Sequence, residues 1–316
     1  MSTPAPTPPV MAGFWRRLGA FMLDGLVLGA IGWVAGLFLS DQFIQMGPWA
    51  RLLGFCVALP YFGLMNSRVG GGQTLGKRAL GIKVVSRDAA LLSIPRAFVR
   101  FLPLGAVWFL NNAQLPQSVQ QSFWSYGPSV VVFGVGLSIL YLFLFNRATR
   151  QSLHDLLVGS YVVRASVNEP IKASPTWPVH LAVCGVFIVG VSLLPLFTQN
   201  LITGPTFSPL FHAYEAVSKP AWVDHVQVTE GQTVMATVSK GQTKTRYLNI
   251  VAYTKDADIG NTERARQLAR LALAADPEAL KLDAVRVSFV YGYDIGIASS
   301  WRSYTHVHAP AEWLAP

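Results

Sequence analysis

Five apolar segments restrict what this chain can fold into more than any other feature of its sequence. They comprise residues 18–39, 49–65, 97–110, 123–145 and 179–197. A bilayer core of about 30 Å requires about 20 helical residues to cross it. The chain is 52% hydrophobic and only 13% charged, whereas soluble domains carry about 25% charged residues. This composition excludes an ordinary soluble enzyme, a disordered chain and a collagen-like chain.

The basic residues predict how the chain crosses the membrane. Residues 1–197 contain 14 Lys and Arg against 5 Asp and Glu, whereas residues 198–316 contain 11 of each. Loops rich in Lys and Arg remain cytoplasmic, so we attribute the excess to the inner membrane face and not to a nucleic-acid surface. The connections 40–48 and 111–122 contain no Lys or Arg. Five crossings then leave the N-terminus in the cytoplasm and the C-terminus outside.

Segment 97–110 is the weakest of the five, because it is short and contains Arg100 and Pro103. A re-entrant or interfacial segment remains an alternative for these residues. However, every basic cluster falls on the cytoplasmic side only if segments 97–110 and 123–145 both cross the membrane. This charge argument is the best support for a crossing at 97–110.

The composition also predicts the domains. Residues 1–13 are rich in Pro, Ser and Thr and are expected to form a disordered cytoplasmic tail. Residues 14–164 form a transmembrane domain, and 165–200 add a linker and a fifth transmembrane helix. From 206 to 316 we expect a small soluble α+β domain on the extracytoplasmic side. The expected fold is therefore an all-α transmembrane bundle of about five helices followed by this domain. Its expected strands are 224–229, 233–239, 246–253 and 284–293, with a helix at 261–275.

Arg17, Ala20 and Asp24 form the first group of candidate site residues, because their spacing places them on one face of a helix. Asp24 then lies about 10 Å deeper than Arg17. An ionised Asp at the centre of a membrane helix costs about 2.5–3.5 kcal/mol, so Asp24 should face the helix bundle. It is either a carboxylate that binds a proton or cation, or one member of a structural ion pair. Gly25 and Gly29 have a spacing that favours close helix packing.

The second group lies in a glycine-rich basic loop at residues 70–85, which contains Gln73, Lys77, Arg78 and Lys83. Residues 71–77 match the start of a phosphate-binding loop, but Arg78 occupies the place where Ser or Thr must hold magnesium. We therefore exclude nucleotide hydrolysis and expect a basic stretch at the anionic inner leaflet. Residues 82–85 are predicted to form a strand paired with 91–94.

The third group lies at residues 150–155 and contains Arg150, Ser152, His154 and Asp155. Ser152 and Asp155 have the spacing of a capping box. His154 and Asp155 are neighbours and point about 100° apart on a helix. Either of these two residues relays protons at a cytoplasmic cavity, or the segment is simply a capped helix start; the sequence leaves both interpretations open.

Together these three groups resemble the RDD family of membrane proteins. The pattern Arg17-x-x-Ala20-x-x-x-Asp24, the block at 72–85 and the block from Arg150 to Asp155 occur in the order typical of that family. The resemblance covers residues 12–163 and implies a multi-pass protein of the bacterial cell (inner) membrane. It also implies that Arg17, Asp24 and Asp155 are the main site residues, with Ala20, Arg150 and His154 supporting them. Some family members are linked to sodium/proton exchange, and others are partners within membrane complexes.

Two functions follow as expectations. The first is a cation/proton exchanger or small-solute transporter in which Asp24 binds sodium, potassium or a proton, held by Arg17. The alternative is a non-enzymatic membrane anchor or assembly protein that presents its C-terminal domain to a partner. Besides the lipid bilayer, we expect a second copy of the chain or another membrane protein as partner. An enzyme is not expected, because the sequence shows no nucleophile–base pair, cofactor motif or metal signature.

Overall fold

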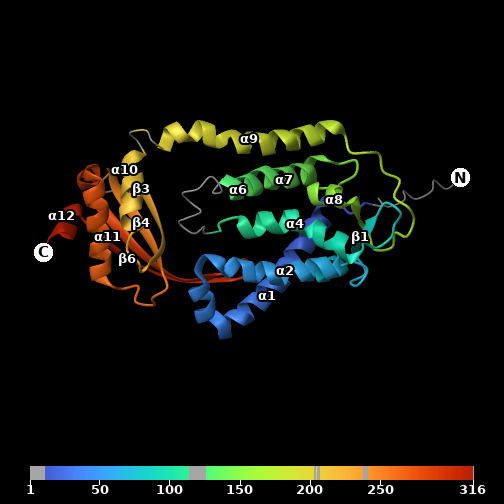
Figure 1. Ribbon diagram of the computed structural model, residues 1–316, viewed down its shortest axis with the longest axis horizontal. Coiled ribbons are helices and arrows are strands. Elements are labelled where there is room, and N and C mark those ends of the chain that lie inside the picture. The colour runs from blue at the N-terminus through green and yellow to red at the C-terminus, as the bar shows by residue number, and fades with distance from the viewer. Residues whose placement is uncertain (1–10, 114–125, 203, 205–206, 238–240, 316) are drawn as a thin grey trace. The chain divides into compact units, whose positions relative to one another are not determined.

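The computed structural model describes residues 11–113, 126–202, 204, 207–237 and 241–315 (Figure 1). The predicted tail 1–13 therefore lies mostly outside the described residues, as do most of the connection 111–122 and the first residues of segment 123–145. The chain divides into two compact units. The helical unit comprises Met1–Phe38, Pro48–Leu194 and Asp294–Ala298, and the sheet unit comprises Leu39–Gly47, Pro195–Tyr293 and Ser299–Pro316.

Apolar helices build most of the helical unit. Helix α1 is joined to α2 by the 3₁₀ turn η1, and the consecutive elements α6, η3 and α7 form one further helical stretch, in which η3 is a π-helix. The bounds are α1 Phe14–Met46, η1 Gly47–Trp49, α2 Ala50–Met65, α4 Ile94–Leu110, α6 Tyr126–Ser129, η3 Val130–Val135, α7 Gly136–Phe145 and α9 Pro178–Ile202.

Three helical stretches among the described residues are long and apolar enough to span a membrane, namely Phe14–Met65, Tyr126–Phe145 and Pro178–Phe197. The first of them contains both of the first two predicted segments, because η1 continues the helical path from α1 to α2. Helix α4 has 17 residues and an internal Pro103, and it is not one of the three. A membrane-spanning helical region followed by a sheet-containing domain is confirmed, whereas the number of crossings remains approximate.

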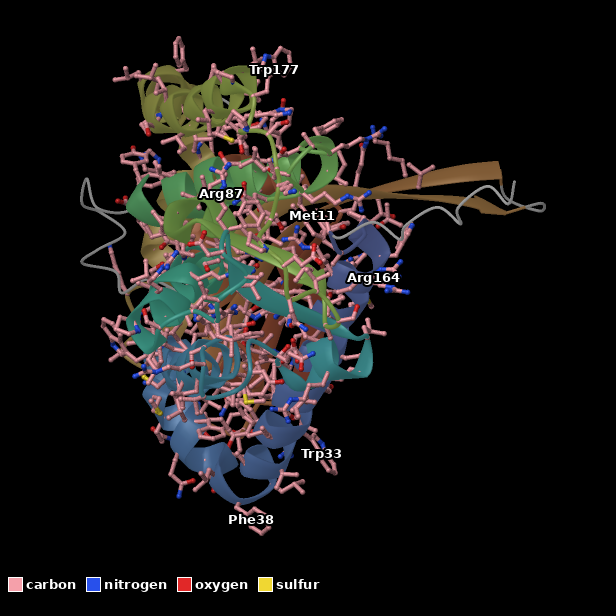
Figure 2. The ribbon with its side chains drawn as sticks, turned by 90° about the vertical axis from the view of Figure 1, so that its right-hand side faces the viewer. Met11, Trp33, Phe38, Arg87, Arg164 and Trp177 are labelled. Carbon is pink, nitrogen blue, oxygen red and sulfur yellow. The ribbon has the colours of Figure 1, made fainter. Side chains whose placement is uncertain are left out.

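The outer faces of these helices are apolar. Trp33 and Phe38 of α1 are 62% and 78% exposed, and their side chains point outward from the ribbon (Figure 2). Large apolar side chains exposed in this number are unfavourable in water. The same side chains are favourable in contact with lipid tails, which supports a membrane location.

Short elements at one end of the helical unit connect the long helices. They are α3 Leu75–Ala79, β1 Ile82–Ser86, α8 Leu153–Val158 and β2 Ser160–Arg164. Strand β1 pairs antiparallel with β2, and Ile82 lies opposite Arg164. The predicted pairing of 82–85 with 91–94 is therefore wrong. The chain turns back at Ser86, whose N–H donates to Ala90 O at 2.8 Å, but α4 begins at Ile94 and leaves too few residues for a second strand.

The sheet unit contains four strands in the order β3-β4-β5-β6. Strands β3 and β4 are antiparallel, whereas β4 and β5 are parallel and are connected through helix α11. The bounds are α10 Ser208–Val217, β3 Val223–Thr237, β4 Gly241–Thr254, α11 Thr262–Ala275, η4 Pro277–Lys281, β5 Ala284–Asp294, β6 Ser299–His308 and α12 Pro310–Leu314.

The core of the sheet unit lies between α11 and the sheet. Leu268 of α11 and Leu248 and Val287 of the sheet are fully buried in one cluster. Asn261 caps α11 by accepting a hydrogen bond from Arg264 N at 2.9 Å. The predicted helix at 261–275 is thus present. The predicted strands 224–229 and 233–239 form one strand as far as Thr237, because the pairing of β3 with β4 continues through Gly231, opposite Tyr247. Residues 238 and 239 lie outside the described residues.

Candidate functional site

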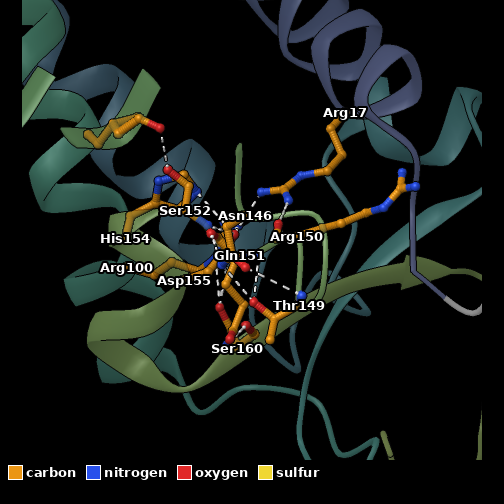
Figure 3. Close-up of polar contacts among 11 residues, drawn as sticks. Arg17, Arg100, Asn146, Thr149, Arg150, Gln151, Ser152, His154, Asp155 and Ser160 are labelled. Atoms are coloured by element: carbon orange, nitrogen blue, oxygen red, sulfur yellow. Dashed lines mark hydrogen bonds and ion pairs between the residues drawn. The ribbon is translucent and has the colours of Figure 1, made fainter. Parts of the chain in front are cut away.

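Asp155, in the first turn of α8, is the centre of a buried polar cluster in the helical unit (Figure 3). Its Oδ2 accepts a hydrogen bond from Arg17 Nη2 of α1 at 2.7 Å. Its Oδ1 accepts from Arg100 of α4, through Nη2 at 2.6 Å and Nε at 3.0 Å. The Asp155 side chain is completely buried, and each arginine side chain is 8% exposed. One carboxylate therefore joins three helices.

The local sequence fixes the position of this carboxylate. The backbone N–H of Ser152 donates to Asp155 Oδ2 at 3.3 Å, as the predicted capping-box spacing requires. Gly159 then ends α8 in the left-handed conformation, with φ of 61°. The chain therefore turns back, so that Ser160 Oγ donates to Asp155 Oδ1 at 3.0 Å.

Arg150 takes part through its backbone and not through its side chain. Arg17 Nη1 donates to the carbonyl oxygen of Arg150. That residue has a positive φ of 53°, and its N–H donates to Asn146 O at 2.9 Å. In Figure 3 the guanidinium of Arg150 points away from Asp155.

The electrostatics of the cluster favour a permanent charge on Asp155. Burial alone would raise the pKa of Asp155, but the positive charges of Arg100 and Arg17 outweigh it and hold that pKa well below its usual range. His154 Nε2 lies 3.7 Å from Asp155 Oδ2, and burial lowers the pKa of His154 to about 3. A histidine that remains neutral at physiological pH is poorly suited to relay protons.

Asp24 belongs to a second cluster with different partners. It is completely buried in α1 and accepts hydrogen bonds from Tyr61 Oη at 2.7 Å, Thr74 Oγ1 at 2.6 Å and Gly76 N at 2.8 Å. The expectation that Arg17 holds Asp24 is wrong, because the guanidinium of Arg17 pairs with Asp155 instead. The two side chains share a helix face but lie about two turns apart.

Ala20 of α1 lies at the contact with the glycine-rich loop, where Gly76 allows the loop to come close. Ala20 is 1% exposed, and a Cβ atom added to Gly76 would lie only 2.1 Å from the carbonyl oxygen of Ala20. The absence of a side chain at Gly76 therefore lets α3 approach α1, so that the Gly76 N–H can reach Asp24.

The four predicted loop residues have different roles. Gln73 Nε2 donates to Ile82 O at 2.9 Å, and Arg78 Nη2 donates to Gly70 O at 3.2 Å, so both stabilise the loop itself. Lys83 Nζ bonds Asn168 Oδ1 at 2.9 Å on the surface. Lys77 is partly buried, its Nζ lies 3.4 Å from Thr74 Oγ1, and burial lowers its pKa to about 7.

A cavity of about 210 Å³ adjoins both clusters. Its polar wall includes Arg17, Lys77 and Arg100, whereas Asp24 and Asp155 do not line it. Two buried polar atoms at this cavity, Asn66 Oδ1 and His154 Nδ1, have no hydrogen-bond partner among the described residues. Among the described residues no group of three or more His, Cys, Asp or Glu side chains is placed to hold a metal ion.

Several residues of these clusters are not predicted from the sequence. In the sequence, Arg100 serves only to weaken the prediction of a membrane crossing at 97–110. In the structure it pairs with Asp155. A charged residue inside an otherwise apolar segment is the signal that it needs a buried partner. Tyr61, Thr74 and Ser160 carry no comparable signal, because hydroxyl side chains are common in membrane helices and turns.

Comparison with known proteins finds similarity over the region that contains both polar clusters. Residues 11–159 match the model of the RDD family. The chain is 29% identical over 164 residues to the uncharacterized protein YckC of Bacillus subtilis (strain 168), which covers 50% of this chain and 87% of that protein. It is also 23% identical over 111 residues to the uncharacterized protein YxaI of the same organism, covering 28% of this chain and 73% of that protein. Residues 11–159 of this chain thus match the RDD family, and the resemblance predicted from the three sequence blocks is confirmed.

Proposed function

We propose that the RDD region is a non-enzymatic membrane anchor that holds the C-terminal domain on the extracytoplasmic side, where it meets a partner. The observation that carries this proposal is the pairing of Asp155 with both Arg17 and Arg100. Breaking a buried ion pair by removing one partner costs about 3–5 kcal/mol. A carboxylate shared by three helices therefore favours one fixed arrangement of α1, α4 and α8.

The surroundings of the cavity also favour an anchor over a cation carrier. Arg17, Lys77 and Arg100 line the cavity, and Asp155, which lies behind its wall, offsets only one of their three charges. A sodium or potassium ion entering it would meet a repulsive field, because like charges repel strongly in a low-dielectric site. Both oxygens of Asp24 already accept hydrogen bonds from described donors, so a cation would have to compete with these donors.

Exchange of sodium or potassium for protons remains the second candidate, and one observation favours it. Asp24 is a fully buried carboxylate with hydroxyl and amide partners but no arginine among its hydrogen-bond donors in the described part of the chain. Buried carboxylates in membrane helices are often sites of proton or cation binding. In that mechanism Tyr61 and Thr74 would release Asp24 when it takes up a cation.

Sealed vesicles containing the purified full-length protein and an internal pH indicator distinguish the two functions. Sodium or potassium is added outside, with protein-free vesicles and vesicles containing Asp24→Asn as controls. An anchor predicts the same pH trace for all three preparations. A cation-dependent pH change that Asp24→Asn abolishes, with the variant still folded, would overturn the anchor and establish exchange.

A further inference from the structure

The cavity beside Arg17, Lys77 and Arg100 is the polar end of a longer groove in the helical unit. A second cavity of about 470 Å³ shares Leu18, Phe21 and Leu104 with the first. Its volume falls in the range of about 300–1,000 Å³ that is typical of ligand sites. The two cavities therefore adjoin each other across these side chains, and the groove that they make has a basic end and an apolar end.

The apolar end reaches the outer surface of the helical unit. Met22 and Leu26 of α1 line the second cavity and are 62% and 71% exposed. Gly25 lines it as well, and a Cβ atom added there would meet nothing within 4 Å. In a membrane these exposed positions face acyl chains, so the groove opens toward the lipid.

The basic end has unbalanced charge and unused polar atoms. Arg17 and Arg100 share a single carboxylate, Asp155, and Lys77 has no carboxylate within ion-pair distance among the described residues. Asn66 Oδ1 and His154 Nδ1 are buried beside the same space, and neither has a hydrogen-bond partner in the described part of the chain. Buried polar atoms in native proteins normally find a partner, which indicates that a ligand or water completes this end.

We propose that this groove binds an anionic phospholipid, with the phosphate beside Lys77, Arg17 and Arg100 and an acyl chain along Phe21, Gly25 and Leu104. Basic pockets between membrane helices on the cytoplasmic side bind anionic headgroups in this way. A zwitterionic lipid leaves the excess positive charge of the pocket unbalanced. Free phosphate satisfies the charge but leaves the apolar end empty.

The first test measures retained lipid. Full-length protein in neutral detergent is titrated with phosphatidylglycerol, phosphatidylcholine or inorganic phosphate, and bound lipid is counted by native mass spectrometry alongside the thermal unfolding midpoint. The proposal predicts that phosphatidylglycerol alone is retained and raises the midpoint. An equal shift of the midpoint with inorganic phosphate would show that the site binds a small anion and not a lipid, and would overturn the proposal. Equal retention of both lipids would show that the site does not select by charge, and would overturn it too.

Matched variants then locate the site. At pH 6, where Lys77 is protonated, Lys77→Gln removes a charge at the cavity, whereas Arg78→Gln removes the neighbouring exposed charge outside it. One basic residue near an anionic lipid contributes about 1 kcal/mol, so Lys77→Gln should weaken phosphatidylglycerol binding about fivefold and Arg78→Gln should not. Gly25→Leu should weaken it by filling the apolar end. Equal effects of the two charge variants, or unchanged binding in Gly25→Leu, would overturn the proposal.

Discussion

The burial of Arg17, Arg100 and Asp155 depends on their pairing, because a charged side chain inside an apolar helix bundle needs an opposite charge beside it. Arg17 and Arg100 approach opposite oxygens of the Asp155 carboxylate, at 2.7 Å and 2.6 Å. Backbone and hydroxyl donors from Ser152 and Ser160 complete its hydrogen bonding. Loss of the carboxylate therefore leaves two buried guanidinium groups without a counter-charge, and this is the costly event.

Asp155→Asn tests this dependence directly. We expect the free energy of unfolding in detergent to fall by about 3–5 kcal/mol, because two buried arginines lose their counter-charge. Asp88→Asn removes an exposed carboxylate and should have little effect. Adding Arg100→Gln to Asp155→Asn should cost less than Arg100→Gln alone; strictly additive losses would show that the two residues do not interact.

Lys77 predicts a pH dependence of stability. Burial lowers its pKa to about 7, whereas an unfolded lysine titrates near its usual pKa of about 10.4. Between these two pKa values the unfolded chain binds more protons than the folded protein, so the free energy of unfolding rises with pH. Below about pH 7 Lys77 is charged in both states, and its burial destabilises the folded protein fully. The groups that act on its charge are Arg100 and Arg17, which lower the pKa, and Asp24 and Asp155, which raise it.

In lipid-free detergent, Lys77→Gln should therefore be more stable than the wild type at pH 6, and this difference should shrink toward pH 9. Unfolding midpoints across this pH range measure it. Lys83→Gln provides the control, because the Lys83 amino group lies at the surface and bonds Asn168 Oδ1. A difference between Lys77→Gln and wild type that stays constant with pH would contradict the assignment of the lowered pKa to Lys77.

At the scale of elements, the contact between α1 and α3 depends on Gly76. An alanine there would place a Cβ 2.1 Å from Ala20 O and 3.0 Å from Asp24 Oδ1, so α3 must move away from α1. We expect Gly76→Ala to destabilise the protein by about 1–3 kcal/mol, as overpacked cores do. Thermal unfolding of the purified protein measures the loss.

Gly25→Ala is the matched control for Gly76→Ala. A Cβ atom added to Gly25 would have no neighbour within 4 Å, and alanine is favoured over glycine inside a helix by about 1 kcal/mol. This variant should be neutral or slightly more stable. Destabilisation by Gly25→Ala equal to that by Gly76→Ala would show that the contact at Gly76 is not specific.

These elements also show what the sequence could and could not predict. Helix α11 follows from its apolar face and its cap at Asn261, and the long apolar helices follow from their composition, because both signals are local. The pairing of β1 with β2 joins residues 82–86 to 160–164. A local residue pattern can predict a strand, but it does not indicate a partner strand so far away in the sequence. Gly25 and Gly29 have a packing spacing, yet Gly25 borders a cavity, because spacing does not say what lies opposite.

The site residues divide in the same way. The family pattern includes Arg17, Asp24 and Asp155, but it does not say which of them pair. Arg17 lies two turns from Asp24 on one helix, and the nearer partner in space comes from α8, more than a hundred residues later. Arg100 also pairs with Asp155. In the sequence alone, this charged residue only weakens the prediction that segment 97–110 crosses the membrane.

For the whole molecule, the proposed anchor requires that the C-terminal domain and the basic loops lie on opposite sides of the membrane. The stretch Pro178–Phe197 has the length and composition of a membrane span and separates the RDD region from most of the sheet unit in sequence. The excess of Lys and Arg over Asp and Glu lies in residues 1–197, with 14 against 5, whereas residues 198–316 have 11 of each. An odd number of crossings places the two ends of the chain on opposite sides.

Cysteine labelling of intact spheroplasts tests this arrangement most directly. In a Cys56→Ala, Cys184→Ala background, Arg87→Cys marks the basic loop and Glu278→Cys marks the sheet unit, both at exposed positions. A membrane-impermeant maleimide should label Glu278→Cys from outside and Arg87→Cys only after the membrane is opened. Labelling of both variants from the same side would contradict the anchor.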